Sequence, residues 1–353
     1  MLELSGAAVL HDNALTEYVF EAFGGDTARA RINADSEKEL IGRHCILGEK
    51  NIKDIPFHTE LSGCILYHHE NADGSGPFGK TEAETPLSAQ LVHLADQLDA
   101  KWDLSFMTKQ KYAAIVKWLE NNKNRMFSSR CVEAFLDGVE LDTLEKMQTN
   151  RIDVLVYEML SQESLEYSEE ELISFSRFFA RIVDYKSEFT RMHSVGIAEK
   201  AMLMAQYYGY PTEKAARLYF AGALHDIGKL VVDRDVLEKP DKLTEEEYRH
   251  VKNHAFATYD TLRKIKGMEE ICSWASFHHE KLDGSGYPFG KTEEELTCEE
   301  RLLGCLDIYQ ALTEKRPYKE GFSHEKSIAI MRDMAQKHKL DGGIIEDIDC
   351  VFA

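Results

Sequence analysis

Residues 218–229 read LYFAGALHDIGK, an almost uninterrupted apolar run that ends in an adjacent histidine and aspartate. The run predicts an apolar helix that is buried in the protein core. Burying His225 and Asp226 at its end would cost on the order of several kcal/mol unless the two side chains are paired or bind a metal. The stretch therefore predicts a polar site at the end of a core helix.

Further histidines and acidic residues lie outward from this stretch on both sides. The second half of the chain holds His193, His225, Asp226, His254, His278, His279 and Asp307. A carboxylate can bridge two cations while imidazoles occupy the remaining coordination positions, so this set predicts two divalent cations inside a helical bundle. Nitrogen and oxygen ligands without thiolates suit Fe, Mn or Zn better than Cu(I) or an iron–sulfur cluster. We expect Fe or Mn, with Zn, Ni and Mg as alternatives.

Three other histidines have an ordinary interpretation. His250 lies one helical turn before His254, and a single histidine of this kind is more often a surface or capping residue than a ligand. His324 and His338 lie on polar helical faces. We leave all three out of the predicted site.

The segment around His278 occurs twice in the chain. HHE at 68–70, DGSG at 73–76 and PFGKTE at 77–82 recur as HHE at 278–280, DGSG at 283–286 and PFGKTE at 288–293, with Tyr287 as an extra residue. The match extends outward, because His11, Asp12, His44 and Asp96 correspond to His225, Asp226, His254 and Asp307 at similar spacings. These spacings indicate an internal duplication.

Helical signals dominate the rest of the sequence. Ser168–Glu171 and Thr244–Glu247 are capping boxes. Apolar periodicity predicts helices over 107–121, 194–208, 212–225, 299–313 and 324–337. Seven prolines and the lack of alternating β-branched runs leave little room for a sheet, and the DGSG clusters predict loops. We expect an all-α fold.

The repeat also suggests how the chain is divided. We expect a first copy over residues 1–139, a helical connector over 140–180, which carries no copy of the repeat, and a second copy over 181–353.

The motifs of the second copy resemble the HD-GYP family, a branch of the HD metal-dependent phosphohydrolases. They are HDIGK at 225–229, HHEKLDGSGYP at 278–288 and LDIYQALTEKRPYK at 306–319. The likeness covers essentially all of 181–353. It implies two HD-type helical bundles in tandem, joined by connecting helices, the first of them degenerate.

The resemblance also implies an activity and roles for individual residues. It implies a cytoplasmic bacterial phosphodiesterase that opens a cyclic dinucleotide, usually c-di-GMP, to a linear dinucleotide or to GMP. One metal would be held by His193, His225, Asp226 and Asp307, and the other by Asp226, His254, His278 and His279. Asp226 and Lys229 would be catalytic, and Lys229, Tyr287, Arg316 and Lys319 would contact the substrate.

One position departs from the pattern of some family members. These hold a third metal with a glutamate four residues before the first histidine, where this chain has Phe189. Glu188 lies about 140° away around a helix and should point elsewhere. We therefore expect two metals, and the final product stays open.

The first copy has lost part of the motif set. It keeps His11, Asp12, His44, His68, His69 and Asp96, but the counterpart of His193 would fall before Met1. Leu15 stands at the position of Lys229, and Tyr287 has no counterpart. We expect a non-catalytic half that docks on the active half or mediates homodimerisation, and metal binding there stays open. A chain truncated at its N-terminus is an alternative.

Composition excludes some partners. The net charge is −20, which disfavours duplex DNA and anionic membranes as partners. No apolar run is long enough to span a bilayer, and the N-terminus lacks signal-peptide features. Seven scattered cysteines without a CxxC motif fit free thiols in the cytoplasm. Two alternatives remain: an HD phosphohydrolase of another nucleotide, and a cyclic-dinucleotide-binding scaffold without turnover.

Overall fold

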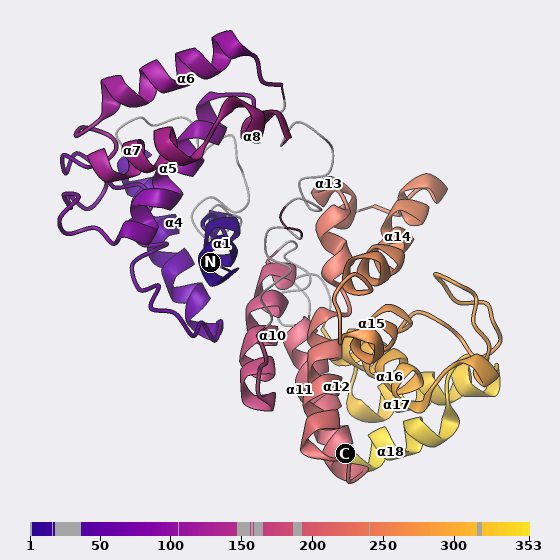
Figure 1. Cartoon of the computed structure of the whole chain (residues 1–353). Coiled ribbons are helices and arrows are strands. Elements are labelled where there is room, and N and C mark those ends of the chain that lie inside the picture. The colour runs from indigo at the N-terminus through magenta and orange to yellow at the C-terminus, as the bar shows by residue number, and fades with distance from the viewer. Residues whose placement is uncertain are drawn as a thin grey trace. The chain divides into compact units, whose positions relative to one another are not determined.

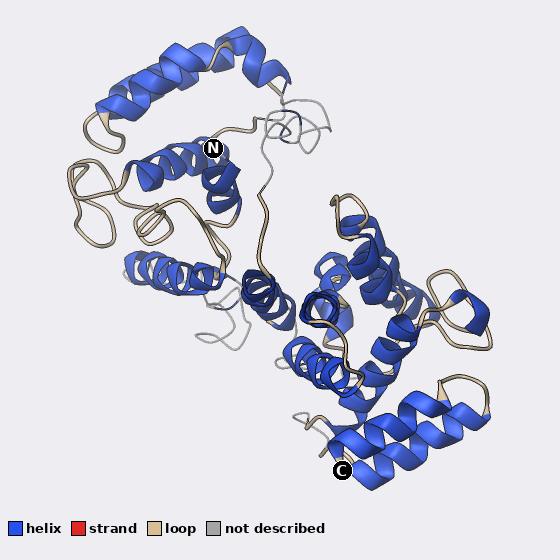
Figure 2. Cartoon of the chain, turned by 60° about the horizontal axis from the view of Figure 1, so that its bottom comes forward, coloured by secondary structure: helices blue, strands red, loops and turns tan. Residues whose placement is uncertain are grey.

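The computed structural model describes residues 2–15, 17, 37–104, 106–146, 156, 158, 165–185, 193–239, 241–315 and 320–353. These residues form helices joined by turns and loops. They contain three isolated β-bridges and no strand, as Figure 2 shows. The predicted all-α fold is confirmed.

The chain divides into two compact units, Met1–Glu166 and Tyr167–Ala353. The helix α10 (Glu169–Asp184) belongs to the second unit, because its apolar face packs against α12 (Thr212–Leu224). Ala180 of α10 shares a buried cluster there with Tyr219 and Ala223 of α12. The three-part division given above stays a prediction.

The first unit is a set of helices around its own apolar core. Its described elements are α1 (Leu2–Val9), α4 (Glu37–Asn51), η2 (Ile52–Asp54), α5 (Leu87–Lys101), α6 (Lys109–Asn122), α7 (Ser129–Gly138) and α8 (Leu141–Lys146). Ile115, Leu119 and Val132 are fully buried and belong to one cluster, to which α5, α6, α7, α8 and the loops between them contribute. This core holds the last part of the unit together.

The second unit has a larger apolar core among the described residues, and its helices follow one another from α10 to the C-terminus (Figure 1). After α10 and before the C-terminus come α11 (His193–Tyr207), α12, η4 (Ile227–Val231), α13 (Arg234–Leu237), α14 (Glu245–Leu262), α15 (Glu269–Ser276), η5 (Glu293–Glu295), α16 (Cys298–Thr313), α17 (His324–Gln336) and α18 (Gly342–Phe352). The helices predicted over 194–208, 212–225, 299–313 and 324–337 correspond to α11, α12, α16 and α17. Both predicted capping boxes are formed, at the starts of α10 and α14.

Helix α12 is the central element of the second unit. It contacts α10, α11 and α15, so its second half is buried on all sides, from Leu218 to Leu224. A helix that is apolar all round is typical of such a position. A Cβ added at Gly222 would lie 3.1 Å from the Cα of Ala198 in α11. The glycine thus allows the close approach of α11, which begins with His193.

A buried glutamate holds each copy of the repeated loop. Glu280 is 5% exposed and accepts backbone hydrogen bonds from Phe289 at 2.7 Å and Lys291 at 2.9 Å. Glu70 accepts the same pair of bonds, from Phe78 and Lys80. The glutamate of the repeated HHE motif therefore fixes the loop fold. In the second unit this loop carries Tyr287.

Glycine is required where the loop passes closest to this glutamate. A Cβ at Gly286 would lie 2.4 Å from the Cα of Glu280, and one at Gly76 would lie 2.7 Å from the Cα of Glu70. No side chain fits at such distances. The second glycine of each DGSG motif is thus explained by packing alone.

We predict that Glu280→Ala lowers the free energy of unfolding of the second unit by about 2–4 kcal/mol, because two buried amides lose a charged acceptor. Urea unfolding and hydrogen exchange at the amides of Phe289 and Lys291 measure this. Glu294→Ala, at an exposed position of the same loop, is the matched control and should change neither. Unchanged protection of the two amides in Glu280→Ala would contradict the assignment.

Candidate metal centre

The end of α12 and the turn that follows it place three polar side chains together. His225 caps α12, Asp226 follows at once, and Lys229 lies in η4. His225 and Asp226 are 1% and 2% exposed. The Nζ of Lys229 donates a hydrogen bond to Oδ2 of Asp226. The end of this apolar helix is therefore a buried polar site, as its sequence predicts.

Two histidines from other elements, His254 and His278, join this group. His254 of α14 places Nε2 3.3 Å from Oδ1 of Asp226, and His225 places Nε2 3.1 Å from Oδ2. The ring of His278, which follows α15, lies 4.8 Å from that of His225 and 5.7 Å from that of His254. One carboxylate thus lies among three imidazoles.

The tautomer of these three rings follows from their backbone contacts. The Nδ1 of His225, His254 and His278 lies 2.8, 2.6 and 2.6 Å from the carbonyl oxygens of Gly222, Val251 and Ala275. Each carbonyl belongs to the residue three positions earlier in the chain. A carbonyl can only accept, so each Nδ1 carries the proton and donates it. In the neutral ring, Nε2 then presents a lone pair.

These lone pairs fit a bound cation. The Nε2 atoms of His225, His254 and His278 are buried and have no hydrogen-bond partner among the described residues. Two of them face the carboxylate of Asp226, and a lone pair opposite a carboxylate oxygen is repulsive unless a positive charge lies between them. Outer hydrogen bonds to carbonyls are also the usual way in which proteins orient histidine ligands. The residues present therefore fit a divalent metal.

A second carboxylate adjoins the first group. Asp307 of α16 places Oδ1 3.2 Å from Nε2 of His193 and Oδ2 3.6 Å from Nδ1 of His279. The ligand atoms of His193, His225 and Asp307 lie within 4.8 Å of one another, as do those of His254, His278 and His279. The structure thus brings together all seven residues predicted as metal ligands.

Burial and charge set the protonation states. Burial alone would raise the pKa of Asp226, but His225 and Lys229 outweigh it and hold this pKa well below its ordinary value. Burial lowers the pKa of His254 and His278, and that of His279 to about 3. An ionised carboxylate at Asp226 beside neutral imidazoles at His254, His278 and His279 is the protonation state that metal ligation requires of these four residues.

Sequence reasoning missed Glu314, which follows α16. Its Oε2 lies 3.2 Å from Nδ1 of His193. Burial would lower the pKa of His193, but its contacts with Asp307 and Glu314 raise it to about 9. Glu314 therefore orients His193, whose other nitrogen faces Asp307. The signal available in the sequence was spacing: Glu314 is seven residues, two helical turns, after Asp307.

The residues predicted to contact substrate are only partly described. The ring of Tyr287 lies 4.7 Å from that of His279 and 6.4 Å from that of His254, so it borders the cluster, and burial raises the pKa of its hydroxyl. Lys229 is in the cluster. Arg316, Lys319, Phe189 and Glu188 lie outside the described residues.

The three excluded histidines have partners elsewhere. His250 lies 3.7 Å from the carboxylate of Asp233. His324 lies 2.8 Å from Asp349 and bonds to Tyr309. His338 lies 3.4 Å from Glu293.

We predict that Glu314→Ala weakens divalent-metal affinity of the second unit about 10–100-fold, the usual effect of removing a group that orients a histidine ligand. Competition with a chelator measures the affinity. Glu246→Ala, at an exposed position of α14, should leave the affinity unchanged. Equal affinities in the two variants would show that Glu314 does not orient the ligand.

Comparison with known proteins places this site in a family. The sequence profile described as HD domain matches residues 3–126 and 177–344. The 3'3'-cGAMP-specific phosphodiesterase 1 of Vibrio cholerae serotype O1 is 30% identical over 90% of this chain and 76% of that protein. The 3'3'-cGAMP-specific phosphodiesterase 3 of the same organism is 31% identical over 85% of this chain and 65% of that protein.

Two further matches differ in coverage. A cyclic di-GMP phosphodiesterase of Pseudomonas aeruginosa is 35% identical over 41% of this chain and 36% of that protein. A crystal structure of a cyclic GMP-AMP-specific phosphodiesterase of V. cholerae matches with a TM-score of 0.59 and 22% identity, over 98% of this chain and 85% of that one. At this identity the structural likeness shows the fold alone. None of the described helices is long and apolar enough to cross a membrane.

The profile matches both halves of the chain, and the His225–Asp226 pair of the second half lies in a cluster of possible metal ligands. HD phosphohydrolases depend on metals. The chain belongs to the HD domain family and carries the HD-GYP motifs in its second copy.

Proposed function

We propose that the second unit is a metal-dependent phosphodiesterase that opens a cyclic dinucleotide. The observation that carries the proposal is the convergence of three unpartnered imidazole nitrogens on the buried Asp226 carboxylate, beside Lys229. The names of the relatives support the same class of substrate.

We also propose that the second unit binds two divalent ions, iron or manganese. His193, His225, Asp226 and Asp307 would hold one ion, and Asp226, His254, His278 and His279 the other. When bound, such a pair makes a water molecule acidic enough to react near neutral pH and stabilises charge on phosphoryl oxygens. No thiol belongs to the groups of possible ligands described in the second unit, which fits these harder metals.

The remaining site residues bind and orient the substrate. Lys229 is 20% exposed at its side chain, so its ammonium group can reach a phosphate oxygen as a point charge. Tyr287 borders the histidines as a neutral phenol, able to donate or accept one hydrogen bond. Arg316 and Lys319 are assigned to phosphate binding from their motif alone.

Two cyclic dinucleotides, which differ in one base, are candidates for the substrate. Five relatives named for c-di-GMP align with half of this chain or less, and so does one relative named for 3'3'-cGAMP. The two that align over 85–90% of it are named for 3'3'-cGAMP. Because of this longer alignment, 3'3'-cGAMP is a second candidate substrate beside c-di-GMP.

The first unit has no such catalytic assignment. Leu15 stands where the second unit has Lys229, so the first unit lacks a cation for phosphate at that point. We propose that it docks on the second unit or on a second copy of the chain. All seven cysteines are free, and a cytoplasmic location is part of the proposal.

We predict that Asp226→Asn lowers hydrolysis of c-di-GMP and 3'3'-cGAMP by at least about 10³-fold, because the metals supply several kcal/mol of transition-state stabilisation. The purified chain is assayed with Mn²⁺ or Fe²⁺ on both substrates. His250→Ala should retain full activity. Binding without hydrolysis in the unmodified chain would support a scaffold, and a fully active Asp226→Asn variant would exclude this site.

We predict a separate role for Lys229. Lys229→Met should lower kcat by about 10²–10³-fold, the usual effect of losing one group that stabilises developing charge, while metal content stays at its normal level. Lys266→Met, at an exposed position, is the control for loss of a lysine charge. A normal kcat in Lys229→Met would remove this residue from the catalytic site.

A further inference from the structure

The first unit contains a second cluster of possible metal ligands, built from four separate segments. It comprises His11, Asp12, His44, His68, His69 and Asp96, the counterparts of six residues in the second unit. The carboxylate of Asp12 lies 3.4 Å from Nε2 of His11 and of His44, and 3.7 Å from Nε2 of His68. The duplication has thus kept the geometry of the cluster as well as its residues.

The cluster also presents lone pairs without partners. His68 is fully buried, and its Nδ1 donates to the carbonyl of Ile65 at 2.6 Å. His11 makes the same kind of bond to Ala8 at 2.8 Å. The Nε2 of each ring and Oδ1 of Asp12 have no hydrogen-bond partner among the described residues. As in the second unit, these atoms fit a cation.

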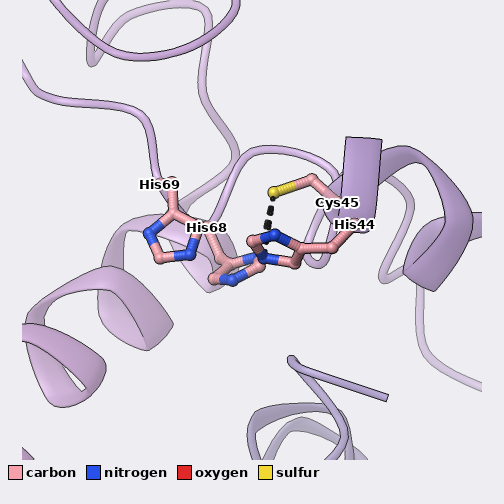
Figure 3. Close-up of side chains that lie close together, drawn as sticks. All are labelled: His44, Cys45, His68 and His69. Carbon is pink, nitrogen blue, oxygen red and sulfur yellow. Dashed lines mark hydrogen bonds between the residues drawn. The ribbon is translucent and has the colours of Figure 1, made fainter. Parts of the chain in front are cut away.

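One residue makes this cluster different from the one in the second unit. Cys45, directly after His44 in α4, stands where the second unit has Ala255 after His254. Its sulfur is fully buried and lies 3.6 Å from Nε2 of His44 and 3.8 Å from Nδ1 of His68, so His68 would ligate through its other nitrogen, Nε2. Figure 3 shows the sulfur directed toward these two rings. The first unit therefore has a soft ligand that the second unit lacks.

The distances suit a tetrahedral ion. A zinc ion about 2.3 Å from sulfur and about 2.0 Å from nitrogen separates the two ligand atoms by about 3.5 Å. The separation of 3.6 Å between Cys45 and His44 is close to this value. One ligand atom from each of His44, Cys45, His68 and His69 lies within 4.8 Å of the other three. A small movement of these side chains would bring all four atoms into contact with one ion.

We propose that the first unit binds a zinc ion of its own, through Cys45, His44, His68 and His69. A thiolate with three imidazoles favours zinc over manganese. Four protein ligands leave no open position for water or substrate, which is typical of a structural zinc site. The ion stabilises the first unit by joining α4 to the loop that carries His68 and His69, because it binds only the folded chain.

Cobalt(II) substitution in the full-length chain tests this proposal. The Asp226→Asn/His278→Ala double variant serves as background, because it disables the cluster of the second unit. Titration with Co²⁺ should produce a saturable thiolate-to-cobalt charge-transfer absorption, and Zn²⁺ should abolish it by displacing the cobalt. Cys45→Ser in the same background should lose this absorption and bind Zn²⁺ at least about tenfold more weakly. Removing a group that only orients a metal ligand already lowers metal affinity about 10–100-fold, and removing the ligand itself should lower it at least as much.

Cys131→Ala is the matched control, because Cys131 is another buried thiol of the first unit and belongs to none of the histidine groups. It should keep the absorption and the zinc affinity. Absence of the charge-transfer band in the background variant, or its survival in Cys45→Ser, overturns the proposal. Cobalt bound without the band would show a site of nitrogen and oxygen ligands only, which also overturns it. None of these results depends on hydrolysis by the second unit.

Discussion

The buried carboxylate of Asp226 is the constraint on which the second unit depends. It lies at the end of the central core helix, where an isolated charge would be prohibitively costly. Imidazoles and one ammonium group surround it, and backbone carbonyls hold three of those imidazoles with their lone pairs inward. The helices that supply the histidines must therefore meet at this point, and the glycine at 222 lets α11 approach closely enough to do so.

Six of the seven residues predicted as metal ligands could be picked out from the sequence because each stands in a short motif that recurs at similar spacing in the first copy. His193 has no counterpart in the repeat, and its assignment depended on the resemblance to the HD-GYP family. Glu314 could not be found in this way. Its role depends on α16 carrying it two turns beyond Asp307, to a point where the start of α11 crosses. The repeat also did not show that α10 packs into the second unit, because α10 has no counterpart in the motif set. Packing between helices decides both features.

The two copies show how one arrangement of ligands can serve different chemistry. In both, a glutamate fixes the DGSG loop and an aspartate lies among histidines. Beyond this shared geometry, single positions differ. The second copy has Lys229 and Tyr287 beside its cluster, suited to a phosphate, whereas the first has Leu15 in place of the lysine and Cys45 in place of Ala255. These differences support one catalytic and one structural metal site.

Anomalous X-ray diffraction from crystals grown with Mn²⁺ or Fe²⁺ tests the central claim most directly. The account predicts two anomalous peaks in the second unit, both in contact with Asp226, with His225 on one peak and His254 and His278 on the other. A fully active protein in which neither metal contacts Asp226 would contradict it.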